Sequence, residues 1–350
     1  RRSAFASIRE FSTVRRLARF LVGVLLGGGA FAGYLASVGA GDVAGRVAEL
    51  PPWAVAVVVL FVVGEGLADG IGVWASVNPL GRGLSKRQSV QFAMAGDFFD
   101  TLSPAGPVSS EPIMARFIGV TTETSYADAL AVRGVAKYVK SGAQLLLSTV
   151  LALSITVGGS SPRFVLVTLA GAVGTLLVGG LVVLRFRAAV SRAVVAVAAP
   201  VVAWASSLYR DDPHDRAVVA SAVERFWARV LLFRDRPGLV GLVAVGGVVE
   251  QVLTAAALYV ALLGIGSGTG AAVSLLPIVA VVPLPQASSI VPIPGSIGAY
   301  DVVLGGALTL VTGAAPAAAA AAVLVVRTVT LPFGLSVGGL SVAFLRGWRP

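Results

Sequence analysis

Nine charged residues lie in or beside apolar stretches of the sequence, and their chemistry sets the problem. They are Glu65, Asp69, Asp97, Asp100, Glu111, Arg133, Glu250, Asp301 and Arg327. A charged side chain inside a membrane is costly, so it usually pairs with another charge or faces a water-filled cavity. Such residues predict a functional site, for example a path for a substrate or an ion.

Two proline-containing segments interrupt the apolar pattern at similar distances from an acid. In TLSPAGPVSSEP, Pro104 precedes Glu111 by seven positions, and in VPIPGSIGAYD, Pro294 precedes Asp301 by the same seven. Proline removes a backbone donor, so a break of this kind is tolerated at membrane depth only where protein or a water-filled cavity surrounds it. We therefore expect two broken helices in the interior of the protein.

A second spacing also matches downstream of the two breaks. Gly119 lies fourteen residues before Arg133, and Gly313 lies fourteen before Arg327. Both segments then follow one order, namely break, acid, helix, glycine, and helix with a buried arginine. We interpret this order as an inverted repeat, although Pro, Gly and Arg are common enough here to align by chance. Two interrupted hydrophobic segments at corresponding positions are typical of a transporter's binding site.

The matched charges predict ion pairs. We expect the pairs Glu111–Arg133 and Asp301–Arg327, or the two crossed pairs. Such a pair neutralises the buried charges in one state of the protein and can open to bind an anionic headgroup in another. The helix N-termini after the breaks would add backbone N–H donors for a phosphate. Alternatively, the pairs only hold the broken helices together. The residues predicted to bind substrate are Glu111, Arg133, Asp301, Arg327, Pro104, Pro294, Gly295, Glu65, Asp69 and Glu250.

Two further groups of charges follow helical spacing. Glu65 and Asp69 are four residues apart, so we expect them on one helix face, turned inward near an arginine or protonated, in either a functional or a structural role. Arg133, Lys137 and Lys140 form a basic stripe on a segment that starts at the membrane interface and dips inward. This stripe fits either a role in the interior or snorkelling to anionic headgroups.

Composition places the chain among integral membrane proteins. Its 350 residues are 56% hydrophobic and only 13% charged, with a mean hydropathy of +0.89. The predicted fold class is an all-α polytopic membrane protein with about six to eight transmembrane helices. The net charge of +10 is nearly all arginine and includes no separate basic domain, so we expect no nucleic-acid partner. Because cysteine is absent and His214 is the single histidine, we expect neither a cofactor nor a metal.

Apolar runs predict the helices that position these residues. The uninterrupted ones are Phe20 to Val38, Trp53 to Val77, Ser141 to Val157, Phe164 to Leu184, Leu239 to Ile265 and Ala315 to Val326. The interrupted segments are Gln91 to Phe117, expected as a re-entrant hairpin or two half-helices, and Ala271 to Val282 with Tyr300 to Val311. Pro332 and Gly334 predict a further break near the C-terminus, and Gly39 to Pro52 predicts a loop. We expect one membrane domain over 1–350, with a first repeat at about 53–157 and a second at about 239–346.

Arginine-rich stretches predict the orientation of the chain. The first nineteen residues, the segment 185–236 and the C-terminal RGWRP are all basic, which indicates the cytoplasmic side. Both termini are therefore expected in the cytoplasm, with the protein integral to the cytoplasmic (inner) membrane. Within 185–236, Ala193 to Ser206 and Ala217 to Leu232 predict two amphipathic helices on the membrane surface.

The two interrupted segments resemble a known family. The first segment, TLSPAGPVSSEPIMARFIGV, resembles the motif P-x-x-x-G-G-E-P-x-R-x-x-x-L of the lysylphosphatidylglycerol synthase transmembrane-region family. The second segment, VPIPGSIGAYD, is similar to the second signature of that family, P-x-P-G-G-x-G-x-x-E. In the family an arginine follows this signature later in the chain. The matching positions are Pro104, Glu111, Pro112, Pro292, Pro294, Gly295, Gly298 and Arg327. The sequence departs from the family at Ser109, Ser110 and Ser296, where glycine is usual, and at Asp301, where glutamate is usual.

The resemblance implies a flippase-like membrane protein that moves lipids or lipid-linked sugars between leaflets. Its expected cargo is an anionic or zwitterionic phospholipid or a polyprenyl-phosphate glycolipid. Because no lysyl-transfer domain is present in these residues, synthase activity is not implied. The alternative is a non-transporting scaffold that partners a cell-envelope glycosyltransferase or lipid synthase through segment 185–236. A membrane-embedded enzyme is disfavoured, because the sequence has no evident nucleophile–base pair or metal cluster.

Overall fold

The computed structural model describes residues 25–26, 28–102, 107–157, 163–207, 216–270, 272–286 and 294–346, and every regular element in them is a helix. In chain order they are α2 (Ala40–Ala48), α3 (Pro52–Val77), α4 (Lys86–Leu102), α5 (Pro107–Thr122), α6 (Tyr126–Val157), α7 (Arg163–Arg185), α8 (Arg187–Ser207), α9 (Arg216–Leu232), η1 (Phe233–Asp235), α10 (Pro237–Ile265), α11 (Leu275–Val281), η3 (Pro294–Ser296), α12 (Ala299–Thr312), α13 (Pro316–Phe333), η4 (Gly334–Gly338) and α14 (Gly339–Ala343).

Five of the described helices are long and apolar enough to cross a membrane. They are Pro52–Val77, Tyr126–Ile155, Val165–Arg185, Pro237–Ile265 and Pro316–Ala343. This confirms the all-α polytopic fold class. The predicted first span, Phe20 to Val38, lies partly outside the described residues and is helical over 28–38.

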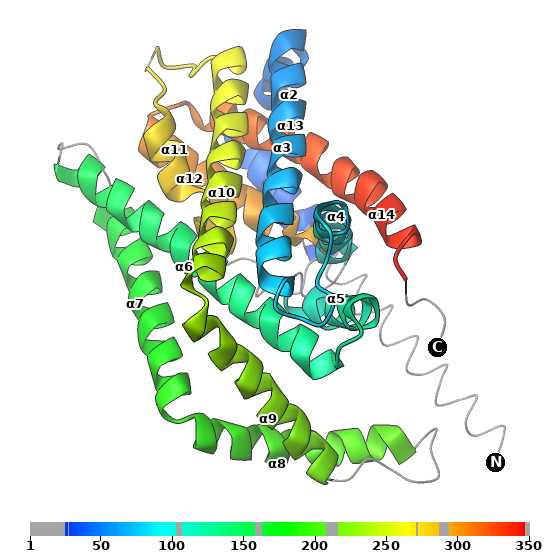
Figure 1. Ribbon diagram of the computed structural model, residues 1–350. Coiled ribbons are helices and arrows are strands. Elements are labelled where there is room, and N and C mark those ends of the chain that lie inside the picture. The colour runs from blue at the N-terminus through cyan, green and yellow to red at the C-terminus, as the bar shows by residue number, and fades with distance from the viewer. Residues whose placement is uncertain are drawn as a thin grey trace.

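The centre of the fold is a close pair of helices, α3 and α10, which run side by side in Figure 1. Glycine explains their contact, because a Cβ on Gly246 of α10 would lie only 3.1 Å from the backbone nitrogen of Gly72 on α3. On its other side α3 packs against α4, where a Cβ on Gly70 would lie 2.8 Å from a methyl group of Val90. Small residues thus let the helix backbones approach closely, as is usual between helices in membranes.

Two sequence predictions about the elements were wrong. The expected loop from Gly39 to Pro52 contains α2, whose Val43 packs against the alanine-rich start of α13. The segment with the basic stripe, which was expected to dip inward, continues without interruption into the apolar run from Ser141 to Val157 as one helix, α6. Pro332 does not end its helix either: the chain continues through the π-helical turn η4, which absorbs the interrupted hydrogen-bond pattern.

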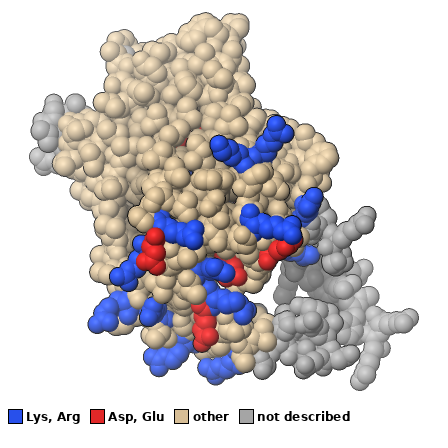
Figure 2. Space-filling view, viewed as in Figure 1, with Lys and Arg blue, Asp and Glu red and all other residues tan. Residues whose placement is uncertain are grey.

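Helices α7, α8 and α9 form an arm at one side of the molecule (Figure 1). Val195 and Ala199 of α8 pack against Val219 of α9, and the two helices are joined by a 2.7 Å hydrogen bond from Trp227 Nε1 to Ser191 Oγ. On the face in Figure 2, the Lys and Arg side chains gather over the part of the molecule that contains α8 and α9. The predicted pair of helices in segment 185–236 is therefore present, while His214 lies outside the described residues.

Candidate functional site

The second expected break is present in the structure. It separates α11 from α12 and includes η3, which begins at Pro294. The first falls between Leu102, the last described residue of α4, and Pro107, the first described residue of α5. That break, with Pro104, lies outside the described residues, as does Pro292. At the second break the backbone needs glycine, because φ is +62° at Gly295 and +84° at Gly298, values that favour a residue without a Cβ.

The predicted pair at the first break is a bidentate one. Arg133 Nε donates to Glu111 Oε2 and Arg133 Nη2 donates to Glu111 Oε1, each at 2.7 Å. The Arg133 side chain is only 7% exposed. This parallel two-bond arrangement is the strongest form of an arginine–carboxylate contact, and it fixes α5 to α6.

The other two cations of the α6 stripe also point into the protein. Lys137 Nζ lies 3.5 Å from Asp100 Oδ2 and 3.4 Å from Glu111 Oε1. Lys140 Nζ lies 2.8 Å from Asp69 Oδ1 and contacts Glu250 Oε2 as well. The stripe therefore neutralises acids from α3, α4, α5 and α10, and the snorkelling alternative is wrong. The direct ion-pair partner of Asp69 is Lys140 rather than an arginine.

Room for Lys140 comes from a glycine on the neighbouring helix. A Cβ on Gly247 of α10 would lie 2.7 Å from Lys140 Cγ. The lysine stem therefore passes directly over the α10 backbone, one turn before Glu250. This close passage lets one ammonium reach acids on both α3 and α10.

The predicted pair at the second break has a different geometry. Arg327 Nε lies 3.2 Å from Asp301 Oδ1, and Arg327 Nη2 donates a 2.6 Å hydrogen bond to the Gly295 carbonyl. The guanidinium also lies over the Tyr300 ring, 4.7 Å from its centroid, at the distance of a cation–π contact.

Asp301 has a second role at the start of α12. Its Oδ2 accepts a 2.8 Å hydrogen bond from the backbone N–H of Gly298, and the side chain is 5% exposed. A carboxylate in the first turn of a helix is favoured by the helix dipole. The N-terminus of α12 is therefore capped by its own acid, and the expectation that it offers free donors to a phosphate is wrong for this donor.

Residues that flank both breaks line one cavity of about 890 Å³. Its lining comes from α3, α4, α5, α6, α7, α10, α12, the second break, and the helix that runs from α13 into η4. The lining residues that the sequence predicted as substrate-binding are Glu65, Asp69, Glu111, Glu250, Gly295 and Arg327. Arg133 and Asp301 are not among the lining residues, because each is buried behind its partner.

Several lining residues were not predicted to bind substrate. Asp97 and Asp100 were singled out from the sequence only as charges in or beside apolar stretches. The others are Lys137, Lys140, Gln144, Gln286, Tyr300 and Thr330. The spacing of the stripe was the signal that could have found Lys137 and Lys140, since it places both on the helix face that carries Arg133. No sequence signal points to Gln144 or Gln286, because their contact spans 142 positions of the chain.

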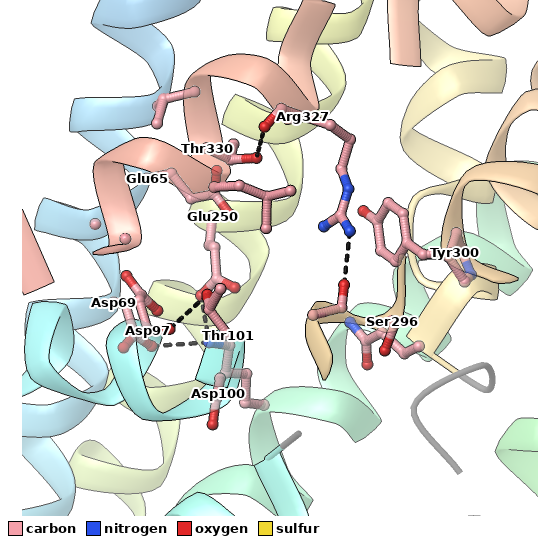
Figure 3. Close-up of a pocket in the computed structure, with 18 of the residues that line it drawn as sticks. Glu65, Asp69, Asp97, Asp100, Thr101, Glu250, Ser296, Tyr300, Arg327 and Thr330 are labelled. Carbon is pink, nitrogen blue, oxygen red and sulfur yellow. Dashed lines mark hydrogen bonds and ion pairs between the residues drawn. The ribbon is translucent and has the colours of Figure 1, made fainter. Parts of the chain in front are cut away.

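Charge is unevenly distributed around the cavity. Figure 3 shows Glu65, Asp69, Asp97 and Glu250 gathered on one side and Arg327 with Tyr300 on the other. The described lining residues include six carboxylates and three cations. Within the described part of the chain, Lys and Arg form ion pairs with neither Glu65 nor Asp97, and no cluster of His, Cys, Asp and Glu there is suited to a metal ion.

An amide network borders the cavity near the second break. Gln144 Nε2 donates to the Gly247 carbonyl at 2.9 Å and Gln144 Oε1 accepts from Gln286 Nε2 at 3.2 Å. Gln251 Nε2 donates to Ser148 Oγ at 2.8 Å and to the Val279 carbonyl at 2.7 Å. These bonds tie α6, α10 and the α11 segment together, so polar groups support the break from behind.

Comparison with known proteins agrees with this architecture. The model of the family described as the lysylphosphatidylglycerol synthase TM region matches residues 18–338. The chain therefore belongs to this family, and the match includes both breaks and all of the cavity. A search of curated proteins finds no significant match. Membership places the chain among membrane proteins of lipid or cell-envelope processes.

Proposed function

We propose that this protein is a lipid translocase, which passes a lipid headgroup through the cavity between the two broken helices. The observation that carries the proposal is the cavity itself: a charged space of about 890 Å³ surrounded by apolar helices. A headgroup crossing a membrane needs polar partners throughout its path, because an unsatisfied polar group in hydrocarbon costs several kcal/mol. The carboxylates, ammonium groups and amides of the lining supply such partners.

Helix α7 provides an apolar surface beside the cavity. Leu176 lines the cavity, while the neighbouring Leu177 and Val178 are more than 60% exposed, as is Leu181 one turn further on. In the proposed mechanism the acyl chains stay on this outer surface while the headgroup enters. The cargo is an anionic or zwitterionic phospholipid or a polyprenyl-phosphate glycolipid, which share a phosphate group. No covalent step is part of the mechanism, so we propose a transport protein rather than an enzyme.

The distribution of arginine supports an orientation for this transport. Exposed arginines cluster on α8, α9 and the short segment that follows, at Arg187, Arg192, Arg216, Arg225, Arg234 and Arg236. By the positive-inside rule this arm lies on the cytoplasmic side. We propose that the protein is integral to the cytoplasmic membrane with both termini in the cytoplasm.

Leaflet exchange in proteoliposomes tests the proposed function. Fluorescent phosphatidylglycerol in the inner leaflet is followed by its accessibility to a membrane-impermeant quencher. Wild-type protein is expected to accelerate exchange, and Glu111→Gln and Arg327→Gln are expected to abolish most of the acceleration. Arg82→Gln is the matched control, because Arg82 pairs with Glu123 at the surface, where the two side chains are 74% and 60% exposed. Exchange no faster with wild type than in protein-free vesicles would refute the proposal for this lipid.

A second candidate function is a scaffold for an envelope-synthesis enzyme, and the arm of α8 and α9 favours it. Arg225 is exposed on α9 and forms no ion pair with any other described residue, whereas Arg229 forms a 2.7 Å ion pair with Asp128. Charge reversal at Arg225 therefore tests docking without disturbing the fold. Copurification of an enzyme that Arg225→Glu abolishes, with leaflet exchange absent in wild type, would favour the scaffold.

A further inference from the structure

The three cations of α6 are held with different strength. Arg133 is bound bidentately by Glu111 and does not line the cavity. Lys140 lies between Asp69 and Glu250 and is 17% exposed. Lys137 is 32% exposed and lines the cavity, and its Nζ stays 3.5 and 3.4 Å from its two carboxylates. A charge-assisted hydrogen bond between an ammonium and a carboxylate is normally about 2.7–2.9 Å long, so Lys137 is the loosely held member.

The acids that Lys137 contacts have other partners. Asp100 accepts a hydrogen bond from Ser110 Oγ, and Glu111 keeps both of its bonds from Arg133. If the Lys137 ammonium moves away, neither carboxylate is left alone. Lys140 differs, because no other described cation pairs with Asp69 or Glu250. Among these three, only Lys137 can leave its acids at low cost.

We propose that Lys137 is the exchangeable cation of the cavity, which leaves Asp100 and Glu111 to bind the phosphate of a lipid headgroup. A lysine suits this exchange, because its ammonium is a compact charge on a flexible four-carbon stem with three donors. The ion pairs of Arg133 and Lys140, on either side of Lys137 along α6, then stay formed during this exchange. The proposal deepens the proposed function, since it names the residue that receives the cargo. Ser141 and Gln144 line the same cavity from the next turns of α6 and supply hydroxyl and amide groups for the rest of the headgroup.

The lysine content of the chain allows a direct binding test. The sequence contains three lysines, Lys86, Lys137 and Lys140, so a small amine-acetylating reagent followed by peptide mass spectrometry reads each one separately. Lys86 is exposed at the start of α4 and serves as the internal control. We expect Lys137 to be acetylated in detergent alone and to be protected several-fold by dioleoyl phosphatidylglycerol. Dioleoylglycerol, with the same acyl chains and no phosphate, should not protect it.

Inorganic phosphate tests whether the site binds the phosphate of a lipid headgroup or free phosphate. Protection of Lys137 by phosphatidylglycerol and not by inorganic phosphate supports a lipid-headgroup site. Equal protection by inorganic phosphate would support phosphate binding and overturn the lipid source. Equal acetylation of Lys137 under all conditions would overturn the proposal altogether.

Variants of Lys137 distinguish a residue that binds the headgroup from one that only stabilises the fold. Phosphatidylglycerol retained by the purified protein should fall about tenfold in Lys137→Gln, as expected when a charge-assisted contact is lost, and recover in part in Lys137→Arg. Lys86→Gln should retain the wild-type amount. Lys137→Gln should melt close to wild type, because Asp100 and Glu111 keep Ser110 and Arg133. A melting loss as large as that of Lys140→Gln would make Lys137 a brace and refute the proposal. If wild-type protein retains phosphatidylglycerol but does not accelerate leaflet exchange, the proposed translocation is refuted, while the role of Lys137 in headgroup binding is not.

Discussion

The two breaks carry an acid and an arginine at corresponding positions, yet the structure uses them differently. At the first break, Glu111 is held in an ion-pair network by Arg133 and Lys137, both from α6. At the second, Asp301 divides its carboxylate between the N-terminus of α12 and Arg327. Equal spacing in the sequence therefore does not imply equal chemistry. Asp301 stands at the third position of α12, from which a carboxylate reaches back to the backbone N–H of the N-cap residue Gly298.

The difference also separates a region that can exchange partners from one that is fixed. Around the first break, three cations on α6 contact four acids from other helices, so one contact can open while others persist. Around the second, a single arginine binds a carboxylate, a backbone carbonyl and an aromatic ring together. We expect headgroup exchange at the first break and positional support from the second.

Removal of the Lys140 ammonium is expected to have the largest effect on stability. In Lys140→Gln, Asp69 and Glu250 remain facing the same space without a described cation, and both are less than a quarter exposed. Loss of one partner from a buried ion pair typically costs about 3 kcal/mol or more. The melting temperature of the detergent-purified protein should fall clearly, while Lys86→Gln should melt as wild type does. Identical melting of both variants would show that Lys140 does not brace α3 and α10.

A smaller effect is expected from filling the space under Lys140. In Gly247→Ala the new methyl group would collide with the Lys140 stem at 2.7 Å, and overpacking of this kind costs about 1–3 kcal/mol. Gly241→Ala is the matched control on the same helix, because its Cβ would meet no atom within 4 Å. Alanine there should be neutral or stabilising, since it favours helix. Thermal melting of the two variants checks this, and an equal shift in both would contradict the packing argument.

Sequence reasoning located the long helices and the second break well. Trp53 to Val77 and Leu239 to Ile265 agree with α3 and α10 within two residues at each end, because a long apolar run leaves few alternatives to a membrane helix. The pairs Glu111–Arg133 and Asp301–Arg327 were also expected, since buried opposite charges must find each other. These features depend on local composition and on the cost of unpaired charge.

Sequence reasoning failed where the answer depends on tertiary contacts. The choice between a snorkelling and an inward-facing Lys140 could not be made, because either environment satisfies the charge; the deciding partner, Asp69, is 71 positions away. Nor could the sequence show that Arg133 and Asp301 lie behind the cavity wall. That outcome depends on the rotation of α6 and α12 about their axes, which packing fixes.

The smallest expected effect distinguishes the two arginines. Arg327→Lys cannot reach the Asp301 carboxylate and the Gly295 carbonyl together and should cost about 1–2 kcal/mol, because the planar guanidinium fork is lost. Arg133→Lys should cost less, since the new lysine retains one contact with Glu111, and Glu111 also keeps its existing contact with Lys137 at 3.4 Å. Melting of the two purified variants side by side measures the difference. A larger loss for Arg133→Lys would show that the bidentate pair at the first break, rather than the three-way contact of Arg327, is the more rigid of the two.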